Sequence, residues 1–171
     1  DTQCESNHCV DGVCCADVCT LNCHRCDISG HEGTCYPVEA GQDPDGDCQG
    51  DGVCSGTCAG GGTACSYPGN STICGECARC NGGGQCSIWV TAGSDPDDEC
   101  PVCQVCSGTA TGCAPVPDGE DPLEECDQQA RETCGNNGFC DGNGACGFWV
   151  EGTECGIGSC SNGNAGFPDT C

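Results

Sequence analysis

The residues best suited to chemistry are carboxylates in a recurring loop pattern, Val-x-x-Gly-x-Asp-Pro-x-x-acid-Cys. The pattern occurs at 38–48, 90–100 and 116–126, and it places an acidic residue four positions after each Asp. Proline stiffens such a turn because its ring fixes φ. Ca²⁺ prefers carboxylate and carbonyl oxygens at about 2.3–2.6 Å. We therefore expect candidate Ca²⁺ ligands at Asp43, Asp45 and Asp47, at Asp95, Asp97 and Glu99, and at Asp121 and Glu125.

The same carboxylates have an alternative, structural interpretation. Asp caps turns by bonding to nearby backbone, and the second acid of each loop is then only solvated. The loops also lack the alternating acidic pattern of an EF-hand and its final Glu. The sequence leaves both interpretations open.

Cysteine is the other residue type with chemistry to offer, and it makes up 27 of 171 residues. Only 19 of the 171 residues are Leu, Ile, Val or Phe. This share is below the roughly 20% under which a highly charged chain is expected to stay disordered. Disulfides must therefore hold the fold, at about 2–4 kcal/mol for each bond. Because the cysteine count is odd, at least one sulfur is free or bonded to another molecule. Cys4 and Cys171 are the candidates for a bond to another chain.

Some of the cysteines stand in a spacing that also suits metals, namely Cys23/Cys26, Cys74/Cys77/Cys80 and Cys100/Cys103/Cys106. In a cytosolic protein such Cys-x-x-Cys pairs hold zinc or iron–sulfur clusters. Here they do not stand apart from the general cysteine framework, so we expect disulfides. Cys19 and Cys23 followed by His24 resemble a haem attachment sequence, but with an extra residue between the cysteines. We therefore expect neither zinc nor haem.

The charge and composition of the chain exclude several functions. A net charge of −24, with three Arg and no Lys, repels nucleic acid and anionic membranes. No apolar run approaches the roughly 20 residues that span a bilayer. The three His lie within the first 31 residues, no Gly-x-Ser-x-Gly is present, and few apolar residues exist to wall the rigid cleft that two-carboxylate catalysis needs. We expect no enzymatic activity, no nucleic-acid partner and no membrane insertion.

The cysteine content also predicts where the protein works. Disulfides at this density persist only in an oxidising compartment, so we expect a secreted protein, extracellular or on the cell surface. The chain contains no Met and begins at Asp1, so we expect that an initiator and a signal peptide have been removed, or that the chain is a fragment. Asn70-Ser71-Thr72 is an N-glycosylation acceptor sequence, which makes Asn70 a candidate glycosylation site.

The loops belong to an internal repeat. A shortened fourth copy runs from Val150 to Cys155, and two cysteines precede each copy. Units of about 20–25 residues are too short to bury a core of their own, so they depend on disulfides and on their neighbours. The sequence predicts a cystine knot-like N-terminal segment, a first repeat with a Gly-rich tail, a second and a third repeat, and a degenerate fourth repeat with a C-terminal tail, at 1–25, 26–76, 77–102, 103–133 and 134–171.

Each unit has the pattern of a small β-hairpin. Apolar pieces at 36–38, 88–90 and 148–150 are typical of brief strands, and the loops at 81–84 and 141–144 carry hairpin-turn residues. Helix is scarce, with a turn or two expected only over 123–132. The predicted fold class is small disulfide-rich repeats: short β-hairpins and loops with little helix, arranged as an elongated necklace of mini-domains.

Part of the sequence resembles a known group of proteins. The resemblance rests on Cys-Val-Asp-Gly-Val-Cys-Cys at 9–15, a Cys-x-x-Cys, Gly-Thr-Cys at 33–35, the loop at 41–48, and Asp-Gly-Val-Cys-Ser-Gly-Thr-Cys at 51–58 before Tyr67-Pro68. Together they resemble the cysteine-rich repeat regions of large secreted or cell-surface proteins of myxobacteria and their relatives, closely from residue 4 to about 74 and more loosely through 126. The resemblance implies secretion and disulfide bonding, and it brings no catalytic or binding residues.

Two functional hypotheses follow. The first is a structural subunit of an extracellular filament, sheath or surface fibre, held by disulfides and Ca²⁺, whose partners are copies of itself arranged head to tail. Heterologous contacts that do not close into a ring propagate in this way. The second is a secreted adhesin or carbohydrate- or protein-binding module, with contact residues Trp89, Trp149, Tyr36 and Tyr67.

Overall fold

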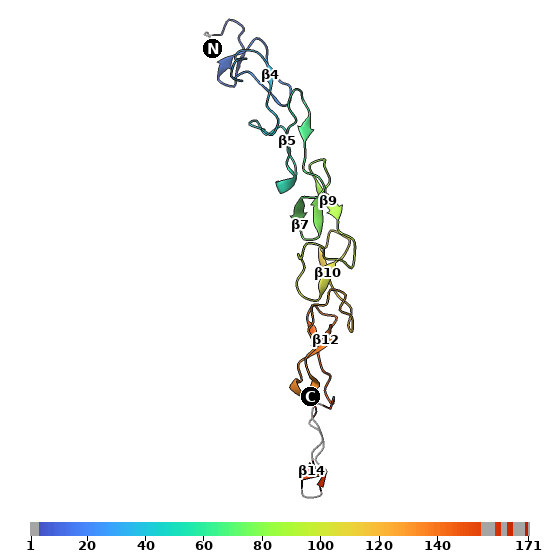
Figure 1. Cartoon of the computed structure of the whole chain (residues 1–171). Coiled ribbons are helices and arrows are strands. Elements are labelled where there is room, and N and C mark those ends of the chain that lie inside the picture. The colour runs from blue at the N-terminus through green and yellow to red at the C-terminus, as the bar shows by residue number, and fades with distance from the viewer. Residues whose placement is uncertain (1–3, 155–159, 162–163, 166–169, 171) are drawn as a thin grey trace. The chain divides into compact units, whose positions relative to one another are not determined.

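A computed structural model describes residues 4–154, 160–161, 164–165 and 170 (Figure 1). Short antiparallel strand pairs dominate this part of the chain. The pairs are β1 (Cys9–Val10) with β2 (Val13–Cys14), β3 (His24–Arg25) with β4 (Tyr36–Pro37), β5 (Thr57–Cys58) with β6 (Cys65–Ser66), β10 (Gln104–Cys106) with β11 (Cys113–Pro115), β12 (Asn136–Cys140) with β13 (Cys146–Phe148), and β14 (Cys160–Ser161) with β15 (Asn164–Ala165). β7 (Ile73–Gly75), β8 (Ala78–Cys80) and β9 (Cys86–Trp89) form a three-stranded sheet.

The described residues contain no α-helix, and their helical content is limited to the 3₁₀ turns η1 (Gly52–Cys54) and η2 (Arg131–Thr133). The predicted fold class of small, disulfide-rich hairpin repeats with little helix is therefore confirmed. The chain divides into two compact units, one extending to Ile88 and one beginning at Trp89.

Side chains close the hairpins where the sequence predicts turns. Between β8 and β9, Oδ1 of Asn81 accepts the backbone N–H of Gly83 (2.8 Å) and of Gln85 (3.2 Å). Between β12 and β13, Oδ1 of Asp141 accepts the equivalent N–H groups of Asn143 (2.7 Å) and Ala145 (3.1 Å). Asn and Asp favour turns because their short side chains reach the backbone in this way. Both predicted hairpin loops are confirmed.

The helical turn expected over 123–132 is wrong for most of its length. These residues form a turn and irregular backbone, and η2 begins only at Arg131. Glu124 has φ 55°, a left-handed conformation that a right-handed helix cannot contain. The turn that follows Asp121-Pro122 therefore overrides the helix propensity of Leu and Glu.

Cystines and two valines make up most of the buried interior. Val38 (2% exposed) and Val116 (1%) are the largest fully buried side chains in the described residues. Val38 lies in a cluster with Cys23, Cys48 and Cys58, and Val116 lies in an equivalent cluster. Each of these two valines is the first residue of an Asp-Pro loop and is the apolar anchor of its repeat, whereas Val90 is partly buried and Val150 is 71% exposed.

A left-handed cysteine starts the hairpin of each repeat. Cys23 (φ 57°) and Cys103 (φ 59°) occupy a backbone region that few non-glycine residues adopt. The carbonyl of Cys23 accepts the N–H of Val38 (2.8 Å), and the carbonyl of Cys103 accepts the N–H of Val116 (2.9 Å). The bond joins the two ends of the hairpin, which places the Asp-Pro loop beside the cysteine.

Disulfides join neighbouring hairpins as well as strands of one hairpin. Cys23–Cys58 and Cys48–Cys65 join the β3–β4 repeat to the β5–β6 hairpin, while Cys103–Cys140 and Cys126–Cys146 join the β10–β11 repeat to the β12–β13 hairpin. We call each such pair of bonds a double staple. Cys23–Cys58 crosses the boundary predicted at 25/26, and both bonds of the second double staple cross the boundary predicted at 133/134. These predicted segments are therefore covalently tied to their neighbours.

Backbone hydrogen bonds reinforce each double staple. Gly119 donates to the carbonyl of Cys140 (3.0 Å), and the N–H of Cys140 donates to the carbonyl of Glu120 (2.9 Å). The first and second loops make the same pair of bonds, to Cys58 and to Cys106. Each Asp-Pro loop thus adds a short antiparallel pairing to the hairpin that follows it.

A glycine two residues after that hairpin cysteine permits the close approach. A Cβ on Gly108 (φ 77°) would lie 3.1 Å from the Cβ of Ala92, and one on Gly60 (φ 83°) would lie 3.0 Å from the Cβ of Ala40. Both the positive φ and the lack of space favour glycine. The recurring Cys-x-Gly of the sequence therefore has a packing reason.

Candidate functional site

The first carboxylate of each Asp-Pro loop is bound to the backbone of its own loop. Oδ1 of Asp43 accepts the N–H of Asp47 (2.8 Å), and Oδ2 accepts the N–H of Cys48 (3.1 Å). The other two loops repeat this geometry at 2.9 or 3.0 Å, with Asp95 accepting from Glu99 and Cys100, and Asp121 accepting from Glu125 and Cys126. Each of these Asp residues therefore caps its turn with both oxygens.

One left-handed residue makes this capping possible. Gly46 (φ 70°), Asp98 (φ 56°) and Glu124 (φ 55°) occupy the same position in the three loops, three residues after the capping Asp. The left-handed backbone turns the next two N–H groups back toward the carboxylate. Only the first loop uses glycine here, the residue for which this conformation costs least.

The second acid of a loop reaches the hairpin of its own repeat. Oδ2 of Asp47 accepts the N–H of Cys23 (2.6 Å), and Oε2 of Glu125 accepts the N–H of Cys103 (2.8 Å). Both donors are the left-handed cysteines. These acids are therefore not merely solvated, because each ties the end of its loop to a cysteine of a double staple.

Asp45 belongs to a different arrangement, centred on Arg25. The guanidinium bonds to Asp27 through Nε (2.7 Å) and Nη2 (2.9 Å) and to Asp45 through Nη1 (2.8 Å), and Asp11 lies 3.7 Å away. The hydrogen bond from Arg25 lowers the pKa of Asp27. Partial burial raises the pKa of Asp45, and Asp11 and Asp47 add to the rise, while Arg25 opposes it. One arginine thus holds three carboxylates together.

Two open cavities border this cluster. The larger, about 470 Å³, is lined by Arg25, Asp27 and Val38 among others. The smaller, about 200 Å³, is lined by Asp11, His24, Asp45 and Asp47 among others. These carboxylates already have a donor: Arg25 for Asp27 and Asp45, and a backbone N–H for Asp11 (from Cys26) and for Asp47 (from Cys23).

The contacts of the predicted Ca²⁺ ligands match the turn-capping interpretation. Asp43, Asp95 and Asp121 accept two N–H groups each, Asp47 and Glu125 accept one from a cysteine, and Asp45 is paired with Arg25. Glu99 is partly buried, and Asp97 is exposed. A carboxylate oxygen has more than one lone pair, so Ca²⁺ binding stays a prediction.

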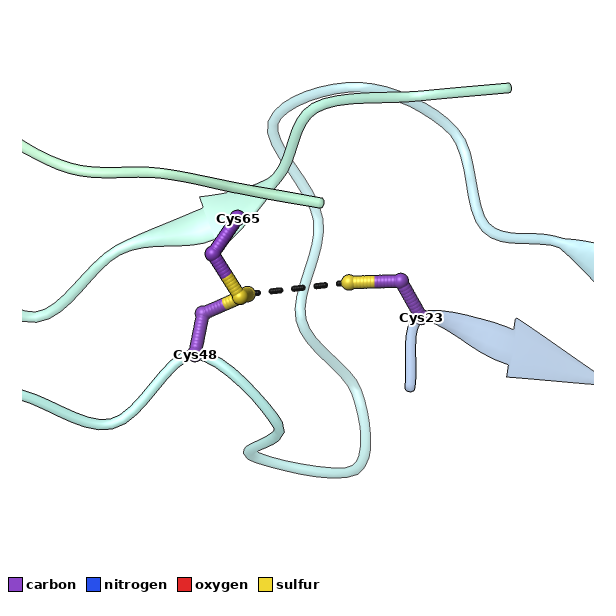
Figure 2. A group of neighbouring side chains, drawn as sticks. All are labelled: Cys23, Cys48 and Cys65. Atoms are coloured by element: carbon purple, nitrogen blue, oxygen red, sulfur yellow. Dashed lines mark hydrogen bonds between the residues drawn. A yellow bond between two sulfur atoms is a disulfide. The ribbon is translucent and has the colours of Figure 1, made fainter. Parts of the chain in front are cut away.

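The cysteines that suggested metal or haem chemistry are in disulfides. Every member of the Cys-x-x-Cys groups predicted from the sequence is disulfide-bonded, as is Cys19. Figure 2 shows Cys23 facing the Cys48–Cys65 disulfide, with 3.6 Å between the sulfurs of Cys23 and Cys48. Since Cys23 is itself bonded to Cys58, neither sulfur carries a hydrogen, and the contact is packing of one cystine on another. The equivalent sulfurs of Cys103 and Cys126 lie 3.1 Å apart.

The expectation for Cys4 is corrected by the structure. Cys4 is 8% exposed and bonded to Cys14, so its sulfur is not available to a second chain. Cys171 lies outside the described residues. Cys9 instead carries an exposed thiol. The sequence held no signal for this, because residues 4–15 contain an even set of cysteines, and only the structure shows that Cys15 bonds to Cys26 outside the hairpin.

The four aromatic residues of the binding hypothesis differ in their contacts. Tyr36 stacks on His31 with ring centroids 3.6 Å apart, and Tyr67 packs against the Val38 cluster. Trp149 donates from Nε1 to the carbonyl of Gln129 (3.1 Å), and the guanidinium of Arg131 lies over its ring. Trp89 is 39% exposed.

Asn70, the predicted glycosylation site, is exposed. Among the described residues, no helix is long and apolar enough to cross a membrane. Comparisons of the chain with protein-family models, with curated proteins and with solved structures found no match.

Proposed function

We propose that this chain is a structural building block of an extracellular filament, sheath or surface fibre. The observation that carries the proposal is the double staple. Neighbouring hairpins are joined by two disulfides and by a pair of backbone hydrogen bonds, and a carboxylate of the loop binds a stapled cysteine of its own repeat. A binding module needs one well-formed surface, whereas these disulfides and hydrogen bonds link each hairpin to the next. The richness in disulfides supports an oxidising, extracellular-type environment.

The partners we propose are further copies of the chain, arranged head to tail. A repeat protein gains stability from contacts between neighbouring units, and the same contacts between chain ends propagate if they do not close. The charge of −24 opposes such contacts through mutual repulsion. Bound cations weaken that repulsion, which gives Ca²⁺ a role even where each carboxylate already caps a turn.

Electron microscopy and gel electrophoresis of the purified protein test the proposal. We expect ordered filaments in the presence of Ca²⁺, and a ladder of multimers in detergent that collapses to one band on reduction if the contacts are also covalent. Discrete monomers in micrographs, together with a monomeric native mass with and without Ca²⁺, would sink the filament proposal and favour the adhesin or binding module instead.

Titration with Ca²⁺ tests the predicted ligands separately. If the loops chelate Ca²⁺, EDTA lowers the melting temperature, and Asp43→Asn combined with Asp47→Asn removes the contribution of one site. Because these substitutions also weaken the turn, the decisive comparison is the heat of Ca²⁺ binding in calorimetry. An unchanged number of bound ions in the double variant contradicts a site in this loop.

A further inference from the structure

The N-terminal hairpin, residues 4–15, brings three cysteines together around one disulfide. β1 and β2 are joined by Asp11 (φ 51°) and Gly12 (φ 78°), the two left-handed residues of a type I′ turn. In this register Cys9 lies directly opposite Cys14. Cys14 is bonded to Cys4, whereas Cys9 carries an exposed thiol.

The ladder of hydrogen bonds shows how closely Cys9 and Cys14 approach. The N–H of Cys15 donates to the carbonyl of His8 (2.8 Å), one position beyond the pair. Cys9 and Cys14 are therefore a non-hydrogen-bonded pair, whose Cα atoms lie about 4.5 Å apart with both side chains on one face. That spacing falls within the range that a disulfide requires. The thiol of Cys9 is thus placed beside a sulfur to which it can bond without movement of the backbone.

We propose that this hairpin is an internal thiol–disulfide exchange site. The thiolate of Cys9 attacks Sγ of Cys14, so a Cys9–Cys14 bond forms while the Cys4–Cys14 bond breaks. Cys4 leaves as a thiolate and takes up the proton that Cys9 released. One disulfide is consumed and one is formed, so the step uses no oxidant and no reductant, and it is reversible.

The exchange changes which part of the hairpin is held. The Cys4–Cys14 bond has a sequence separation of 10 and keeps Cys4 buried at 8% exposed. The Cys9–Cys14 bond joins strands that already pair and leaves residues 4–8 without a covalent link to β2. The thiol that appears at Cys4 is then free to react with another sulfur. The exchange itself is independent of the proposed filament, and it holds for a monomer.

The double staples supply no comparable arrangement. The double staples place sulfurs 3.1–3.6 Å apart, but both partners of each contact are already in disulfides. A disulfide does not exchange without an attacking thiolate. In the N-terminal hairpin the exposed thiol of Cys9 lies in register with a disulfide-bonded cysteine, Cys14.

Alkylation of the native protein followed by peptide mapping tests the proposal. The protein is incubated with iodoacetamide at pH 6, 7 and 8, quenched in acid and digested with pepsin, and the label is located by tandem mass spectrometry. We expect label on Cys4 as well as on Cys9, with peptides linked through Cys9–Cys14 wherever Cys4 is labelled. The rate of Cys4 labelling should rise about tenfold for each pH unit, because the thiolate is the attacking species.

Two variants complete the test. In Cys9→Ser the attacking sulfur is gone, so Cys4 should stay unlabelled at every pH. In Cys4→Ser, oxidation in a glutathione buffer should give a Cys9–Cys14 bond, which reports the geometry even if the first variant folds poorly. Equal labelling of Cys4 with and without Cys9, no labelling of Cys4 in the native protein at any pH, or failure of Cys9 and Cys14 to bond would each overturn the exchange.

Discussion

A carboxylate that accepts two backbone N–H groups stabilises a turn as a capping residue stabilises the start of a helix. Asp43, Asp95 and Asp121 do this in three loops, at the same spacing each time, although the residue in the left-handed position differs. The repeated Asp is thus explained without a ligand. In the first and third loops the second acid bonds to a left-handed cysteine, which explains why an acid precedes the last cysteine there.

Substituting Asp121 by Ala should loosen the third loop locally. The N–H groups of Glu125 and Cys126 lose their acceptor, a loss of about 1–2 kcal/mol for a capping side chain, so their hydrogen exchange should become about 5–30 times faster. Glu120→Ala is the matched control, because it removes the same charge from the same loop. Equal effects of the two substitutions would show that charge, and not capping, is what matters.

Substituting Arg25 by Gln should raise the pKa of both Asp27 and Asp45. The pKa of Asp27 is lowered by its bond to Arg25, so the stability from this pair is present above the ordinary carboxyl range and is lost as the pH falls through the lowered value. The pKa of Asp45 is already raised by burial, so it takes up its proton first. Carboxyl ¹³C NMR titration measures both, and Arg131→Gln should change neither. Coincident titration of the two groups in the native protein contradicts this account.

At the scale of the element, none of the described hairpins is large enough to be stable alone. Two-stranded ribbons of two to five residues bury little, and isolated hairpins are marginal in water. Their stability therefore depends on covalent links and on the pairing of each loop with the following hairpin. The double staple supplies both at the same point, since Cys140 carries a disulfide and both backbone bonds to the third loop.

Removing one staple should open the junction that it spans. For Cys126→Ser with Cys146→Ser, the lost bond has a sequence separation of 20, worth about 3 kcal/mol by loop-closure entropy. The amides of Gly119 and Cys140, which cross the junction, should then exchange roughly 100-fold faster. Cys74→Ser with Cys86→Ser removes a bond within the β7–β8–β9 sheet and should leave these two amides unchanged. Slow exchange in both variants would mean that the hydrogen bonds hold the junction without the disulfide.

At the scale of the whole molecule, the disulfides replace a hydrophobic core. Among the described residues, 22 cysteines are bonded, so at most five of the 27 in the sequence (27 − 22) are open to reagents. We expect intact-mass measurement after alkylation in denaturant, without reductant, to show no more than five labels. Reduction should then abolish the native fold, measured as loss of amide protection. More than five labels would require a different set of bonds.

The sequence by itself determined the construction of this protein in outline. The excess of cysteine over large apolar residues required disulfides, and Asn81 and Asp141 predicted their hairpin loops, because turn formation depends on neighbours along the chain. The repeated Asp-Pro marked three loops that share one capping geometry, because that geometry also depends on near neighbours along the chain. One local pattern gave a wrong prediction, the helical turn over 123–132, because the left-handed turn at Glu124 overrides the helix propensity of these residues.

Only the tertiary structure decided which sulfurs meet and what the acids contact. Cys23–Cys58 and Cys103–Cys140 have sequence separations of 35 and 37, and nothing in the local sequence distinguishes these cysteines from the others. Pairing depends on which sulfurs the folded hairpins bring within bonding distance. Likewise Asp47 reaches Cys23 across 24 positions, and Cys4 rather than Cys9 is bonded to Cys14. Contacts of this kind are set by packing in space, because many pairings of identical residues satisfy the same sequence.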